Sequence, residues 1–218
     1  MKKKGLNRKN VYLAVALLAA FGIWTVLLRL IDVQAIGPQG SSVGMATLNR
    51  LVHRLTGVHF FLYTITDWLG LVPIGTAFGF AVLGLIQWIK RKDLRRVDRS
   101  ILALGGFYAV VMGVYALFET VVVNYRPVLI NGCLEASYPS STTLLTLCVM
   151  PAAMMQLKKR IQGKTRRRVV LCSIAAFTAF MVLGRLASGV HWITDIIGGG
   201  LLSGGLLAAY AAVSGDRF

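Results

Sequence analysis

The sequence of 218 residues contains few charged residues and very few acidic ones. Only 15% of the residues are charged, 8 are Asp or Glu against 24 Lys or Arg, and 56% belong to the hydrophobic set. The mean hydropathy of +0.68 excludes a disordered chain and is not typical of an ordinary soluble domain. The composition therefore indicates a membrane protein.

The sequence also lacks the marks of a multidomain, disulfide-bonded or metal-binding chain. No Pro/Ser-rich linker or low-complexity segment interrupts it, so we expect one domain. Its 3 cysteines, Cys133, Cys148 and Cys172, form neither a metal-binding spacing nor an even-numbered disulfide framework, and we expect them to be packing residues. We expect no metal and no cofactor, because His191 and Asp195 could supply two ligands but no third or fourth is evident.

Apolar runs recur at the length that a bilayer-spanning helix needs, roughly 17 to 25 residues. We predict an all-α integral membrane protein, a six-helix bundle with an interfacial helix in its first outer loop. The single domain 1–218 is expected to contain spans at 11–31, 68–89, 101–123, 139–157, 169–186 and 192–213, and an interfacial helix at 43–56. Val33 and Ala35 resemble a signal-peptide cleavage site, but the first run exceeds the usual apolar region of roughly 7 to 15 residues, so we interpret it as a span.

Basic residues are concentrated in alternate connections. Five of the 24 precede residue 10 (Lys2, Lys3, Lys4, Arg8 and Lys9), six lie at 90–99, seven at 158–168 and one is Arg217, whereas the other connections carry only Arg50, Arg54, Arg126 and Arg185. The positive-inside rule then predicts a multi-pass protein of the cell membrane with cytoplasmic termini and extracytoplasmic sparse loops. An RNA-binding patch is the alternative interpretation, but basic anchors beside spans are much commoner, so we expect no nucleic-acid partner.

The first outer loop is long and contains an amphipathic segment. Leu48, Leu51 and Leu55 recur at about helical spacing, with Asn49 and His53 between them, which indicates a helix along the outer interface. This helix could roof a lipid entrance, or it could be a loop helix whose apolar side packs down onto the protein. Both interpretations remain open, and we slightly favour the second.

Polar and ionisable residues gather at the outer ends of the predicted spans. They are Glu119, Arg126, Pro139, Ser140, Ser141, Thr142, Arg185, His191 and Asp195. The predicted topology puts all of them on the same face of the membrane. Such residues are costly in a bilayer and are therefore functional candidates. Taken singly, each arginine could instead extend its side chain to the lipid headgroups without a functional role.

Together these residue types predict a pocket for a phosphoryl group. His191 and Asp195 are four apart, so on a helix the carboxylate can hold one ring nitrogen and leave the other free to attack. Arg126 and Arg185 supply planar cations suited to phosphate oxygens, and the turn at 139–142 adds hydroxyls and a helix N-terminus. Taken singly, these features could be a hydrogen bond on a helix face or an N-cap.

These residues resemble the signature motifs of the type 2 phosphatidic acid phosphatase family, which are integral-membrane lipid phosphatases. The third family motif reads Ser-Arg, five residues, His, three residues, Asp, and here Gly184-Arg185, His191 and Asp195 fit it except for the serine. The resemblance implies that His191 is the nucleophile that forms a phosphohistidine, that Asp195 orients it and that Arg185 is a phosphate ligand. It also agrees with six spans, an outer site and no metal.

The other two motifs match with departures. The second, Pro-Ser-Gly-His, falls on Pro139-Ser140-Ser141-Thr142, and the first, Lys, six residues, Arg-Pro, falls on Glu119 and Arg126-Pro127. By resemblance, these positions bind the substrate. Threonine at position 142 replaces the family's general acid, a role typically worth about 10² to 10⁴-fold in rate. The loss should affect monoesters more than diphosphates, because a phosphate departs as a stable anion.

Glu119 replaces a lysine that would stabilise the transition state. It could be protonated and act as a donor or substitute acid, it could pair with Arg126 or Arg185 as a brace, or it could recognise a cationic headgroup. We favour the brace. His53, His59, Tyr125 and Tyr138 are further candidates for a replacement acid, but the sequence does not place them within reach, and we expect them to be interfacial residues.

The sequence thus predicts a membrane lipid phosphatase that acts on the outer face through a phosphohistidine. Its partner is a phosphorylated lipid, preferably an isoprenoid diphosphate such as the carrier lipid of bacterial wall synthesis. One alternative is an impaired family member that binds or transports a lipid phosphate without turnover. Another is a lipid phosphotransferase.

Overall fold

The chain forms a bundle of long helices in a computed structural model that describes residues 7–215. The helices are α1 (Arg8–Leu30), α2 (Ala46–Thr56), α3 (Phe60–Leu69), α4 (Leu71–Arg91), α5 (Arg99–Thr120), α6 (Ser141–Arg160), α7 (Lys164–Ala187) and α8 (Ile193–Ser214), with 3₁₀ turns η1 (Pro38–Gly40) and η2 (Leu94–Arg96). No β-strand occurs between residues 7 and 215. The basic residues Lys2, Lys3, Lys4 and Arg217, used for the predicted topology, lie outside the described residues.

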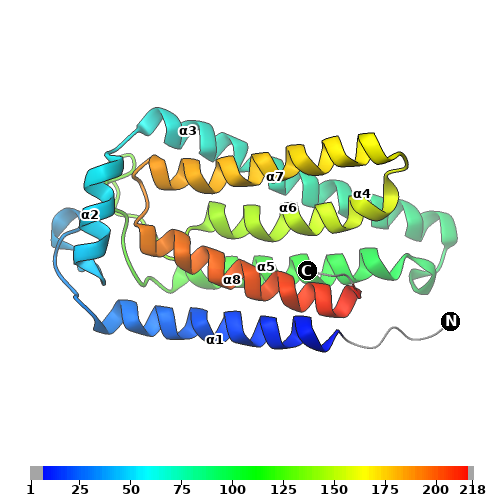
Figure 1. Cartoon of the computed structure of the whole chain (residues 1–218), viewed down its shortest axis with the longest axis horizontal. Helices are drawn as coiled ribbons and strands as arrows, with labels where there is room; N and C mark the ends of the chain where they lie inside the picture. The colour runs from blue at the N-terminus through cyan, green and yellow to red at the C-terminus, as the bar shows by residue number, and fades with distance from the viewer. Residues whose placement is uncertain (1–6, 216–218) are drawn as a thin grey trace.

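The long helices run side by side, and α2 lies across one end of the bundle (Figure 1). The connections at 57–59, 121–140 and 188–192 lie at that same end. The other end carries the basic connections α4–α5 and α6–α7, and α1 begins and α8 ends there (Figure 1). This arrangement brings the predicted site residues to one end of the bundle.

Five helical segments of residues 7–215 are long and apolar enough to cross a membrane. They are Arg8–Leu30, Phe60–Arg91, Arg99–Thr120, Lys164–Ala187 and Ile193–Ser214. The second begins before the predicted 68–89, because α3 and α4 follow each other with a break at Gly70. Pro73 explains the break, since it has no N–H to donate and its ring crowds the carbonyl four residues earlier.

The predicted span 139–157 corresponds to α6, which is outside that set of five. Its buried side chains include Thr146 and Gln156, and it ends with three basic residues. Helix α6 instead lies within the bundle, where α5, α6 and α8 form the core. The core side chains are Leu104, Phe107, Val111, Leu144, Cys148, Ala152, Leu202, Leu207 and Tyr210.

Helix α2 does not pack its apolar side onto the protein, which was the interpretation that we slightly favoured from the sequence. Its buried residues are Ala46 and Asn49, and the Asn49 amide donates to the Thr194 hydroxyl at 3.0 Å. Leu51 and Leu55 on the other side are 58% and 80% exposed. The reason is that the polar side of α2 hydrogen-bonds to the start of α8, which leaves the leucines facing outward.

Candidate functional site

A hairpin-like loop at 121–140, between α5 and α6, positions Arg126 and Ser137 at the site. Asn131 and Gly132 both have positive φ, the conformation of a tight Asn-Gly turn. Below the turn, the Arg126 amide donates to the Glu135 carbonyl at 3.0 Å, and the Ser137 amide donates to the Asn124 carbonyl at 2.9 Å. Arg126 and Ser137 are therefore held together at the base of the loop.

The α7–α8 turn carries His191 and is fixed against the α2–α3 connection. Gly189 has φ +67°, and a Cβ built there would lie 1.7 Å from the Gly57 carbonyl oxygen, so only glycine fits. The His59 amide donates to the Ser188 carbonyl at 2.9 Å. These contacts hold the turn that presents the imidazole.

The spacing of four residues predicts that His191 and Asp195 lie on one helix, but the structure places only Asp195 on it. Helix α8 begins at Ile193, so His191 lies in the preceding turn, while the Asp195 carboxylate accepts from the Trp192 amide at 2.9 Å. The Nδ1 of His191 is 3.7 Å from Oδ2 of Asp195, too long for a hydrogen bond. The Ser137 hydroxyl lies between them, 3.1 Å from Nδ1 and donating to Oδ2 of Asp195.

Arg185 reaches the other side of the imidazole. Its Nη2 is 3.5 Å from Nε2 of His191, and its Nη1 is 3.4 Å from both the Thr66 hydroxyl and an Asp67 carboxylate oxygen. The guanidinium is almost completely buried, with 1% of the residue exposed, and its Nε has no hydrogen-bond partner. A buried cation with unused donors is suited to bind an anion.

Arg126 lies on the same aromatic ring as Arg185. The guanidinium carbons of Arg126 and Arg185 are 5.8 Å and 4.8 Å from the centre of the Tyr63 ring. Arg126 forms an ion pair with Glu135, at 3.1 Å from its Nε, but its buried Nε and Nη1 have no partner in hydrogen-bond geometry. Two partly unsatisfied guanidinium groups therefore flank one side chain of α3.

The environment of His191 favours the neutral imidazole. Burial lowers its pKa well below the ordinary value of 6.5, and the positive charges of Arg126 and Arg185 lower the pKa further. A neutral ring retains a lone pair, which a nucleophile requires.

Glu119 lies at the small cavity that His191 lines. Pro139, Ser141 and Tyr138 line the same cavity, which has a volume of only about 10 Å³. Within the described chain, Glu119 forms no ion pair with Arg126 or Arg185. The two arginines pair instead with Glu135 and Asp67, so the favoured interpretation of Glu119 as a brace is wrong.

The residues of the second motif have different surroundings. Ser140 is fully buried and its amide donates to the Asp195 carbonyl at 3.2 Å. Ser141 lines the small cavity, whereas the methyl group of Thr142 lies beside Gly70 at the α3–α4 break. Helix α6 begins at this site, and its first backbone amides have no hydrogen-bond partner within the helix.

Thr66 explains why glycine occupies position 184. A Cβ built at Gly184 would lie 2.8 Å from the Thr66 methyl carbon, which is closer than carbon atoms pack. Thr66 is completely buried and its hydroxyl faces Arg185. The threonine of α3 thus takes the space that a serine side chain would need.

Several site residues could not be identified from the sequence. Tyr63, Asp67, Glu135 and Ser137 all contact the predicted residues, but they belong to none of the three motif matches. The one signal was that Glu135 and Ser137 belong to the outer loop that carries Arg126. Within residues 7–215, no group of three or more His, Cys, Asp or Glu is placed to hold a metal ion.

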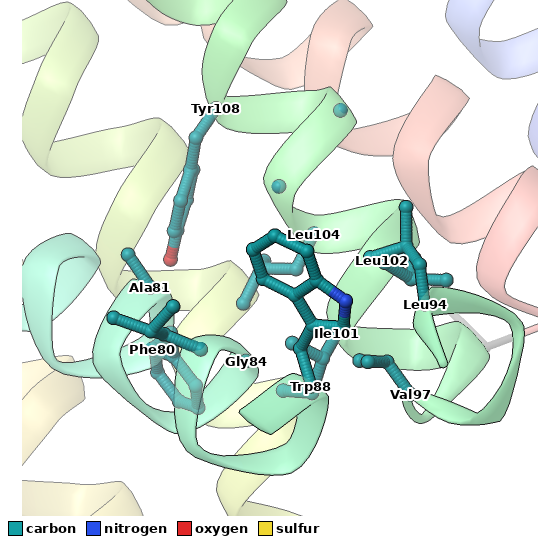
Figure 2. Close-up of a pocket in the computed structure, with 13 residues that line it drawn as sticks. Phe80, Ala81, Gly84, Trp88, Leu94, Val97, Ile101, Leu102, Leu104 and Tyr108 are labelled. Carbon is teal, nitrogen blue, oxygen red and sulfur yellow. The ribbon is translucent and has the colours of Figure 1, made fainter. Parts of the chain in front are cut away.

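A larger, apolar cavity of about 520 Å³ lies between α4 and α5 toward the basic end of the bundle. Figure 2 shows Trp88, Val97 and Ile101 around one part of it and Tyr108 at another, with the tyrosine hydroxyl directed toward Ala81. Tyr108 also lines a second apolar cavity, which reaches Tyr115. Tyr115 in turn lines the small cavity at His191. The three cavities thus follow one another along α5.

The long apolar helices indicate a membrane protein, and the buried imidazole beside the Arg185 guanidinium is a candidate anion-binding site. Residues 119–218 match the model of the PAP2 superfamily. The fold is similar to that of a transmembrane PAP2 type phosphatidylglycerolphosphate phosphatase from Bacillus subtilis, with 19% sequence identity, a TM-score of 0.52, and coverage of 91% of this chain and 94% of that chain. No curated protein sequence matches.

The C-terminal part of the chain, residues 119–218, thus matches the PAP2 superfamily, and the similar fold agrees with that match. This confirms the family predicted from the motifs. The family match covers α6, α7 and α8, the loop with Arg126, and the end of α5, so all nine predicted site residues lie within it.

Proposed function

We propose that this protein hydrolyses the phosphate group of a phosphorylated lipid on the extracytoplasmic face of a cell membrane, with His191 as the nucleophile. The observation that carries the proposal is the position of Nε2 of His191, 3.5 Å from the Arg185 guanidinium. Arg126 adds a second buried guanidinium with unused donors. A phosphoryl group bound by both arginines would lie next to the imidazole.

The reaction follows from these positions. Nε2 attacks phosphorus, the N–P bond forms, and the P–O bond to the leaving group breaks with its electron pair on the departing oxygen. The arginines stabilise the charge on the equatorial oxygens. Water then attacks the phosphohistidine, which releases inorganic phosphate and restores the ring.

The preferred substrate class is an isoprenoid diphosphate. Thr142 cannot protonate a leaving alkoxide as an imidazole would, and a lipid monophosphate leaves without that help. The two apolar cavities along α5, which share Tyr108, support a long hydrocarbon chain. From Ile101 to Glu119, α5 extends about 27 Å at the helical rise of about 1.5 Å per residue.

The test uses purified protein and a lipid diphosphate labelled with ³²P on its terminal phosphate. We expect labelled protein after a rapid acid-free quench, and release of labelled phosphate at longer times. His191→Gln should remove both signals, while His59→Gln, a histidine at the N-cap of α3, should retain them. Absence of label and of phosphate release, under conditions where a complete family member is active, would refute the proposal.

Binding without turnover is the second candidate. It is favoured by Thr142, whose methyl group packs beside Gly70, and by the carboxylate of Glu119 at the cavity. A lipid diphosphate that binds but yields no phosphate would support this candidate, and transfer of label to a second lipid would support the phosphotransferase.

A further inference from the structure

The hydroxyl of Ser137 is the link between the imidazole and the carboxylate of this site. The direct separation of 3.7 Å from Nδ1 of His191 to Oδ2 of Asp195 excludes a hydrogen bond between them. Ser137 Oγ is 3.1 Å from that nitrogen and donates to that oxygen. All three residues are at least 97% buried, so water does not compete for these contacts.

We propose that Ser137 is a positioning residue that holds the proton of His191 on Nδ1 and so keeps the lone pair on Nε2, the atom that faces Arg185. This inference rests on the proposed function and names a residue that acts through the nucleophile. It requires a specific direction for each hydrogen bond.

The donors and acceptors leave one consistent arrangement. Ser137 has a single hydroxyl hydrogen, which it donates to the Asp195 carboxylate, so its oxygen must accept from Nδ1–H. On the opposite side of the ring, Arg185 can only donate, so Nε2 must carry the lone pair. Both contacts select the same tautomer.

The same arrangement has a consequence for the reaction. When Nε2 forms its bond to phosphorus, the ring becomes positively charged and keeps its Nδ1–H. The hydroxyl of Ser137 accepts from that N–H while it donates to Asp195, so the carboxylate stabilises the new charge through the serine. No proton has to leave the ring during the step.

The loop explains how Ser137 reaches this position. Its backbone amide donates to the Asn124 carbonyl at 2.9 Å, which closes the base of the hairpin-like loop. The backbone, and not only the side chain, therefore determines where the hydroxyl lies.

Kinetics provide the first test. We expect Ser137→Ala to lower kcat about 10- to 100-fold with little change in KM, because the ring loses a hydrogen bond to a charged network while both arginines remain. Ser137→Thr, which retains a hydroxyl, should recover part of kcat. The matched control is Ser203→Ala, which removes a buried hydroxyl bonded to the Gly199 carbonyl within α8 and should leave kcat unchanged.

Nitrogen NMR provides a readout that does not depend on activity. The chain has only 3 histidines, so ¹⁵N-histidine labelling gives few signals, and His191→Gln identifies those of His191. We expect the wild type to show protonated Nδ1 and unprotonated Nε2, and Ser137→Ala to shift the ring toward the other tautomer. Thermal unfolding of each variant shows that it is folded.

The possible results are distinguishable. A wild type without phosphoenzyme or phosphate release refutes the proposed function, whereas its NMR spectrum still tests the tautomer. If the wild type is active and Ser137→Ala retains both its kcat and the Nδ1–H tautomer, the inference about Ser137 is overturned. A wild-type ring protonated on Nε2 also overturns it.

Discussion

Nη2 of Arg185 lies 3.5 Å from Nε2 of His191, although the two side chains come from the end of one helix and from the turn that follows it. Arg185 is held there by Asp67 and Thr66 of α3. A cation in this position repels a proton from the ring and, in the proposed mechanism, binds the phosphoryl group that the ring attacks.

The geometry of Arg185 should matter as well as its charge. Arg185→Ala is expected to lower kcat by about 10²- to 10³-fold, as for the loss of one transition-state donor. Arg185→Lys should remain well below wild type, because an ammonium cannot contact Asp67, Thr66 and phosphate with one planar group. Steady-state hydrolysis of a lipid diphosphate measures both, with Arg54→Lys on the exposed surface of α2 as the control. Wild-type rates for Arg185→Lys would contradict this role.

The motif departures should determine the substrate preference. Thr142→His together with Glu119→Lys is expected to raise hydrolysis of phosphatidic acid more than hydrolysis of an isoprenoid diphosphate, since only the monoester needs an acid for its leaving oxygen. The measurement is the ratio of kcat/KM for the two lipids. An unchanged ratio would show that the missing acid does not set the preference.

Position 184 should be coupled to position 66. Gly184→Ser alone is expected to destabilise the protein by about 1–3 kcal/mol, because the new side chain collides with the Thr66 methyl group. Adding Thr66→Ala should relieve much of this loss. A double-mutant cycle of unfolding free energies in detergent measures the coupling, and additive effects would refute the steric explanation.

Stability should decrease with acidification through His191. Its folded pKa is held well below 6.5, first by burial and then by Arg126 and Arg185. The unfolded chain therefore binds a proton that the folded chain does not, so stability falls as the pH falls from about 6.5 toward the folded pKa. The melting temperature of His191→Gln should fall less over this range than that of the wild type. His59→Gln is the control for the loss of one histidine.

The outward leucines of α2 should contact lipid, which would make this helix interfacial as predicted. In a chain with Cys133 and Cys172 replaced by serine, a spin label at Leu55→Cys should be relaxed mainly by oxygen, and a label at Arg54→Cys mainly by a water-soluble nickel complex. The leucine is 80% exposed and has no protein surface against it that would exclude lipid. Equal relaxation of both labels by the nickel complex would refute lipid contact.

Much of the fold could be predicted from the sequence, because a spanning helix leaves a long apolar run. The apolar runs predicted the helices α1 and α4 to α8. The alternation of basic and sparsely charged connections predicted that the motif residues lie at one end of the bundle. The helix bounds were less accurate at α3, since Phe60 and its neighbours precede the predicted start of the second span and are separated from α4 by the break at Gly70. The outward face of α2 could not be predicted, because amphipathic spacing defines two faces and not which one meets the protein.

The site was predictable only where spacing carried information. His191, Arg185 and Asp195 have fixed separations within one motif. Ser137 and Asp67 have none: the serine reaches Asp195 from 58 residues away, and Asp67 reaches Arg185 from 118 residues away. Such contacts arise from the packing of α3 and of the outer loop, which no local pattern encodes.

The hairpin-like outer loop positions two residues of the candidate site, Arg126 and Ser137. Arg126, a proposed phosphate ligand, and Ser137, whose hydroxyl lies beside His191, come from the two paired segments of this loop, 11 residues apart in sequence. A displacement of this loop would therefore break the contact between Ser137 and His191 and also move the Arg126 guanidinium away from the site. Substrate binding and the orientation of the imidazole would then be lost together.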